Sequence, residues 1–125
     1  MKLNSLVKFL FVATFLFSAQ VDINTATSIS KNFFESRMGE IYDLNTVEVI
    51  SDDENSLLYV FILNPTGFII VSGNDAAMPV LGYSFENSYR QDSLPIQLEW
   101  MFDQYKDDIQ QMNINNSEPT DEIRS

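Results

Sequence analysis

The stretch GFIIVSGNDAAMPVLGYS, residues 67–84, decides the fold of this chain. It contains two apolar runs, FIIV at 68–71 and VLGYS at 80–84, on either side of a polar turn. The turn lacks the further glycines and the lysine of a phosphate-binding loop. We expect it to need a positive φ at Gly73 or Asn74. The pattern predicts two antiparallel strands.

The residues before this stretch extend the predicted sheet. LLYVFIL at 57–63 is continuously apolar and is followed by NPTG, where Pro65 and Gly67 stand at positions that a tight hairpin favours. Continuous apolar runs of this length are typical of central strands buried on both faces. TVEVI at 46–50 alternates in polarity, which predicts a strand with one wetter face, and the acidic SDDENS after it predicts a turn.

A helix is predicted on each side of the strands. NTATSISKNFFESR, residues 24–37, has a candidate cap at Asn24 or Thr25 and is followed by Gly39, a typical helix end. The second helix is predicted over residues 95–112. Its apolar residues recur at steps of three and four: Leu98, Met101, Phe102, Tyr105, Ile109 and Met112.

The predicted fold class is therefore α+β, with a three- to four-stranded antiparallel sheet and an N-terminal and a C-terminal helix packed on it. Residues 1–19 predict a signal peptide, because two lysines precede a short apolar run that ends in small residues. We expect cleavage after Ala19 and export to the periplasm or the medium. Residues 20–112 form the predicted domain, and 113–125 a disordered tail.

Composition excludes most catalytic chemistry. The 125 residues include neither Cys nor His, so thiolate nucleophiles, His-based triads and the usual zinc sites are excluded. Asp52, Asp53 and Glu54 lack the spacing of a calcium loop and are interpreted as a turn. Asp103 and Asp107 lie four residues apart on the polar face of the last predicted helix. The chain is predicted to be no enzyme and to hold neither a cofactor nor a metal.

Net charge restricts the partners. Removing residues 1–19 takes away two of the 7 cations and none of the 18 acids, which leaves a net charge of −13. Nucleic acid and anionic membrane surfaces both require a basic patch, so neither is an expected partner of the mature chain. Composition and spacing favour a binding protein, monomeric when free.

Residues 67–84 and the helix sequence LPIQLEWMFDQYKDDI together resemble the pro-domains of streptopain-type cysteine proteases and the stand-alone streptopain inhibitors, the Spi family. The resemblance covers roughly residues 25–109. It implies a streptopain-like cysteine protease as the partner and non-covalent blockage of its active-site cleft. In the protease precursors a catalytic domain with Cys and His follows the last helix, and here both residue types are missing.

The resemblance also implies a partner-binding segment at the entry to the last helix. The expected contact residues are Ser93, Leu94, Pro95, Ile96, Gln97 and Trp100. Gln97 matches by position a polar pro-domain side chain that reaches the catalytic region of the protease, although Asn is expected there. Two alternatives stay open: Gln97 is a solvated first-turn residue, and Trp100 flanks the core.

Two other functions compete with inhibition. The chain would act as a detached pro-region that assists folding of the protease, or as an envelope-binding module that shares only the fold.

Overall fold

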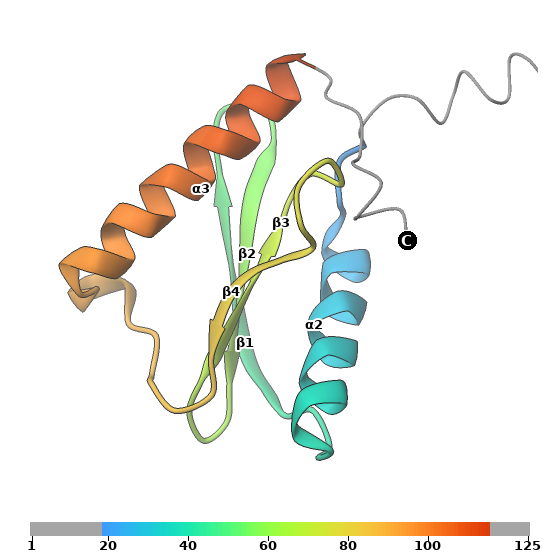
Figure 1. Cartoon of the computed structure of the whole chain (residues 1–125), viewed down its shortest axis with the longest axis vertical. Coiled ribbons are helices and arrows are strands. Elements are labelled where there is room, and N and C mark those ends of the chain that lie inside the picture. The colour runs from blue at the N-terminus through green and yellow to red at the C-terminus, as the bar shows by residue number, and fades with distance from the viewer. Residues whose placement is uncertain (1–18, 116–125) are drawn as a thin grey trace, which may run out of the picture.

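The computed structural model describes residues 19–115, so most of the predicted signal peptide and residues 116–125 of the predicted tail lie outside the described residues. Within residues 19–115, two helices, four strands and one short 3-10 turn follow one another, and this α+β arrangement confirms the predicted class (Figure 1). The elements are α2 (Ile23–Met38), β1 (Leu44–Ser51), β2 (Ser56–Leu63), β3 (Phe68–Ser72), β4 (Val80–Ser84), η1 (Gln91–Ser93) and α3 (Ile96–Asn115). Between residues 19 and 115, no helix combines the length and apolarity that a membrane span requires.

The sheet is an antiparallel meander in which each strand pairs with the next, in the order β1-β2-β3-β4. β2 and β3 are its two central strands, and every residue of β3 is buried. Phe61 on β2 lies opposite Val47 on β1 and Ile69 on β3. The continuous apolar runs therefore occupy the central positions predicted for them.

The two helices cover opposite faces of this sheet, α3 on one side and α2 on the other (Figure 1). Successive side chains of a strand point to opposite faces. Accordingly Leu58 and Val60 pack in the cluster beneath α3, whereas Tyr59 and Phe61 pack in the cluster beneath α2. A helix on each face explains why β2 and β3 lack the polar alternation of a one-sided sheet.

α2 begins earlier than predicted because its cap is Asp22, not Asn24 or Thr25. The Asp22 carboxylate accepts a hydrogen bond of 2.7 Å from the Thr25 N–H, and this bond lowers the pKa of Asp22. Gly39 ends the helix as predicted, with φ 66° and its N–H donating to the Glu35 carbonyl.

The buried stripe of α2 contains one polar residue. Ala26, Ser30 and Phe34 are its buried residues, and they recur at steps of four. Ser30 is a polar residue in an apolar interface. Its hydroxyl lies 2.6 Å from the Tyr42 hydroxyl and donates to the Thr27 carbonyl, so its burial leaves no polar atom unsatisfied.

α3 packs through the predicted stripe, with Phe102 and Ile109 fully buried. It continues to Asn115, so residues 113–115 of the predicted tail are helical. The Tyr105 hydroxyl donates a hydrogen bond of 2.8 Å to the Leu81 carbonyl on β4. A Cβ at neighbouring Gly82 would lie 3.4 Å from that hydroxyl, so glycine lets the helix approach the strand closely.

Gly73 is needed for a reason other than the predicted one. Positive φ occurs among the glycines of residues 19–115 at Gly39 and Gly67, and not at Gly73. A Cβ at Gly73 would instead lie 2.2 Å from the Ser56 carbonyl oxygen. Close backbone packing between the end of β3 and the start of β2 therefore requires this glycine.

The acidic turn between β1 and β2 is organised by one carboxylate. Asp52 Oδ1 accepts hydrogen bonds from the backbone N–H groups of Asn55 and Glu54, at 2.7 and 2.9 Å. These bonds lower the pKa of Asp52, since they favour its charged form. The acidic residues therefore form a turn in which the Asp52 side chain accepts hydrogen bonds from the backbone of the same turn.

We predict that Phe61→Ala lowers the free energy of unfolding by about 3–5 kcal/mol, because this fully buried ring would leave a cavity between the sheet and α2. Chemical denaturation followed by circular dichroism measures the change. Ile41→Ala is the control, since Ile41 is 90% exposed and its loss is expected to cost less than about 0.5 kcal/mol. Equal, small effects of both substitutions would contradict the two-faced core.

Candidate functional site

The predicted partner-binding segment lies where the chain enters α3. The helix begins at Ile96, one residue later than predicted, and the Pro95 carbonyl accepts the first helical hydrogen bond from the Glu99 N–H. Gln97 therefore stands in the first turn, where backbone N–H groups have no partner within the helix. Its side chain is exposed. The segment offers hydrogen-bond donors to an approaching protein.

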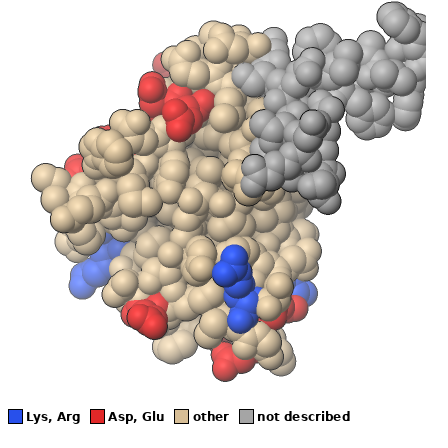
Figure 2. All heavy atoms as spheres, viewed as in Figure 1, with Lys and Arg blue, Asp and Glu red and all other residues tan. Residues whose placement is uncertain are grey.

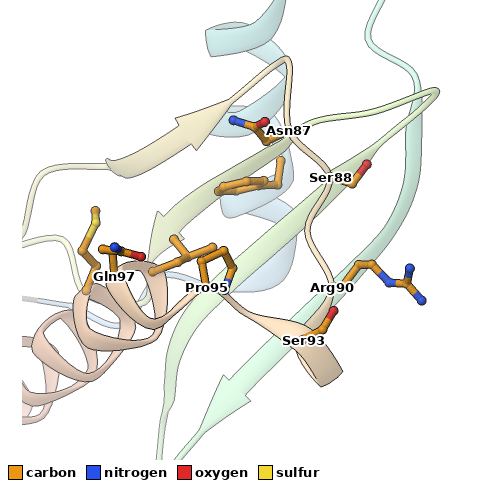
Figure 3. A pocket seen from close by; sticks show the side chains of 9 residues that line it. Asn87, Ser88, Arg90, Ser93, Pro95 and Gln97 are labelled. Atoms are coloured by element: carbon orange, nitrogen blue, oxygen red, sulfur yellow. The ribbon is translucent and has the colours of Figure 1, made fainter.

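A hollow of about 550 Å³ separates this helix entry from the loop that follows β4. Figure 3 shows Pro95 and Gln97 on the helix side and Asn87, Ser88, Arg90 and Ser93 on the loop side. Phe68, Leu98 and Met101 supply apolar surface to the same hollow. A side chain with an apolar body and a polar end fits this combination of surfaces.

A second hollow of about 500 Å³ lies on the other side of Gln97. Its lining residues are Ile96, Gln97, Trp100 and Met101, and nearly all of the lining surface is apolar. Gln97 and Met101 line both hollows, so they form a ridge between them, here called the helix-entry ridge. Ile96 and Trp100 flank it and are 76% and 64% exposed.

The loop beside the ridge is anchored by Tyr89, which is buried although the residues around it are exposed. Its ring centroid lies 5.7 Å from that of Phe102 on α3 and 5.8 Å from that of Phe68 on β3. Aromatic contacts at these distances stabilise beyond their burial alone. A hydrogen bond of 2.9 Å between the Ser88 and Thr66 hydroxyls ties the loop to the β2–β3 turn.

The Tyr89 hydroxyl stays protonated at physiological pH. Burial raises the pKa of Tyr89, and the neighbouring Glu48 carboxylate raises it further. Arg90, Asp92 and Tyr89 of the loop and Glu48 of β1 line a polar recess. The loop is thus held by a neutral aromatic anchor, and its charged residues Arg90 and Asp92 are exposed.

The structure brings the six predicted site residues into one region. Ser93 and Pro95 line the first hollow, Ile96 and Trp100 line the second, and Gln97 lines both. Leu94 packs against the core cluster beneath α3 and fixes the segment from below. Because Trp100 is mostly exposed, it does not flank the core, which was one of its two predicted placements.

Sequence reasoning missed the loop side of the first hollow. Asn87, Ser88 and Arg90 belong to FENSYRQDS, residues 85–93, a mostly polar stretch between β4 and α3 that is not among the predicted contact residues except at Ser93. Tyr89, an aromatic residue with polar and charged neighbours on both sides, was the available signal that the loop is anchored. Without a buried residue, a polar loop would not be held in one position next to the helix entry.

Charge is dispersed over the surface. On the face in Figure 2, acidic and basic side chains are scattered and uncharged residues cover most of the surface. Near the site, Arg90 Nε lies 3.9 Å from Asp92 Oδ1, and both side chains are exposed, so this pair contributes little to stability. Among residues 19–115, no group of three or more acidic side chains is placed to hold a metal ion.

Comparison with known proteins places this geometry in a family. The family model described as Spi protease inhibitor matches residues 18–109, which include the whole sheet and the six predicted site residues. No curated protein and no solved structure gives a match. Because the match covers most of the chain, the protein belongs to the Spi protease inhibitor family.

Proposed function

We propose that the protein is an exported inhibitor of a streptopain-like cysteine protease and blocks the active-site cleft without a covalent bond. The helix-entry ridge is the observation that carries this proposal. Gln97 and Met101 line both hollows and Gln97 is exposed, so the ridge is accessible to a concave partner. A protease cleft is such a partner, and its walls would enter the two hollows.

The residues of the ridge suit non-covalent blockage of a protease active-site cleft. The Gln97 amide donates and accepts hydrogen bonds, so it can satisfy polar groups of the enzyme. The chain contains no Cys or His that would react with a catalytic thiol. Trp100 adds a large exposed aromatic surface next to the ridge, a residue type enriched at the centres of interfaces.

Pre-organisation supports tight binding. Tyr89 holds the loop on the core and Leu94 holds the segment before the helix, while Pro95 restricts its own φ. A segment that is already ordered loses less conformational entropy when it docks. The free protein would bind through its existing shape, with little rearrangement.

The first prediction is reversible inhibition of a streptopain-like protease, measured with a short chromogenic substrate. Activity should fall as the protein is titrated and return on dilution. Since the chain is strongly acidic, the association rate with a basic cleft rim should fall with added salt. An absence of inhibition at micromolar protein would refute the proposal. A higher refolding yield of the protease without inhibition would favour the folding-chaperone alternative.

The second prediction separates the ridge from the rest of α3. Gln97→Ala should weaken inhibition by about 1–3 kcal/mol, roughly 5- to 150-fold, because polar groups of the enzyme lose their partner. Gln104→Ala is the matched control. Gln104 is exposed on the same helix seven residues away, about 10 Å along the axis and on nearly the same side.

The inhibition constants of the two variants and their melting temperatures provide the test. Melting temperatures should stay unchanged, since both glutamine side chains are exposed. Unchanged inhibition by Gln97→Ala together with a large loss for Trp100→Ala would move the contact from the ridge to the outer helix face.

The third prediction concerns the anchor of the loop. Tyr89→Ala should weaken inhibition at a temperature where the variant is still folded, because the loop loses its contacts with Phe68 and Phe102. Tyr89→Phe should restore most of it by restoring the ring. Tyr83→Ala, which removes an aromatic ring from the α2 side, is the control. Full inhibition by the folded Tyr89→Ala variant would show that the loop needs no anchor.

A further inference from the structure

The first described residues form an integral part of the sheet region. Residues 19–21 run antiparallel to the turn after β3, with an isolated bridge between Gln20 and Asn74. The Val21 N–H donates to the Gly73 carbonyl at 2.9 Å, and the Asp75 N–H donates to the Ala19 carbonyl at 3.0 Å. In Figure 1 this segment, at the blue end of the colour range, lies next to the loop between β3 and β4.

Ala19 makes both of its backbone hydrogen bonds to one residue. Its carbonyl accepts from the Asp75 N–H, and its own N–H donates to Asp75 Oδ1 at 2.7 Å. A chain that began at Gln20 would lose both bonds. The Asp75 N–H would lose its acceptor, and the Asp75 carboxylate would lose its donor.

Side chains connect the same segment to the far end of α3. Gln20 Nε2 and Asn74 Nδ2 both donate to Asn113 Oδ1, at 2.6 and 2.7 Å. Asn74 is 2% exposed, so its amide requires these partners. The Tyr59 hydroxyl on β2 donates to the Val21 carbonyl at 2.6 Å. The folded domain therefore includes residues 19–21 and does not begin at α2.

We propose that the signal peptide is cut between Ser18 and Ala19, one bond earlier than predicted, and that the new amino group pairs with Asp75. The cut adds one water across the peptide bond, which leaves a carboxylate on Ser18 and an amine on Ala19 that is protonated at neutral pH. The Ala19 nitrogen already lies 2.7 Å from Asp75 Oδ1. Processing places a positive charge on the donor, so a hydrogen bond from a neutral amide to a carboxylate becomes an ion pair.

Two features of the sequence support this bond as the processing site. A cut after Ser18 places Leu16 three positions before the cleaved bond, whereas a cut after Ala19 places the bulkier Phe17 there, where signal peptidases prefer small residues. The family match also begins at residue 18, next to the proposed bond. This inference depends on the proposed export and not on inhibition, so inhibition assays test the function independently.

The direct test is N-terminal sequencing and intact mass of the protein purified from a bacterial host that exports it. The expected first residue is Ala19. Protein that begins at Gln20 or later would overturn the proposed bond, and full-length protein beginning at Met1 would overturn the export on which it rests.

A second experiment tests the charge pair with purified protein that begins at Ala19. One sample keeps its free amine and the other is enzymatically acetylated at the N-terminus, which retains the N–H but removes the charge. The free amine should raise the melting temperature by about 1–5 °C, as expected for an exposed pair in a domain of this size. In Asp75→Asn the difference should disappear. Equal melting temperatures in the unsubstituted chain would overturn the pairing.

Discussion

The burial of β2 and β3 on both faces is the constraint on which the rest of the structure depends. Two adjacent strands without a polar face cannot form a stable sheet surface in water, so each face requires a cover. α2 and α3 supply those covers from the two ends of the chain. Gly73 lets the end of β3 approach the start of β2, and Gly82 lets α3 approach β4, so that strands and helix can pack closely.

This layered arrangement separates two tasks. The α2 face holds aromatic and aliphatic side chains between helix and sheet, whereas the α3 face adds the loop and the helix-entry ridge. Phe68 connects the two roles, since it belongs to the core cluster beneath α3 and also lines the first hollow. The site is therefore built on the core itself, which gives the ridge a rigid base.

The sequence predicts well those features that repeat. Continuous apolar runs placed β2 and β3, and steps of three and four residues placed α3, because each pattern reflects many side chains meeting one environment. Features that depend on one contact were harder to predict. The backbone crowding at Gly73 involves Ser56, a partner that local sequence does not identify. The cap of α2 depends on one hydrogen bond between Asp22 and Thr25, and neighbouring Asn24 and Thr25 offered equally suitable cap residues.

The candidate site shows the same division. The resemblance predicted a contact segment at the helix entry, which is continuous in the chain, and the structure places its six residues in one region. Asn87, Ser88 and Arg90 were missed because they face Pro95 and Gln97 only once Tyr89 has docked on Phe68 and Phe102. The spacing of residues along the chain does not predict that this loop faces the helix entry, because tertiary packing determines that contact.

The meander order of the strands affects how long the folding chain is exposed to proteolysis. Each strand pairs with its neighbour in the chain, so the sheet forms from contacts that are close in sequence, and such contacts form quickly. A protease cuts unfolded chains far more readily than folded ones, and a protease inhibitor is exposed to that hazard while it folds. Local strand pairing shortens this exposure, in a chain that has no disulfide to complete.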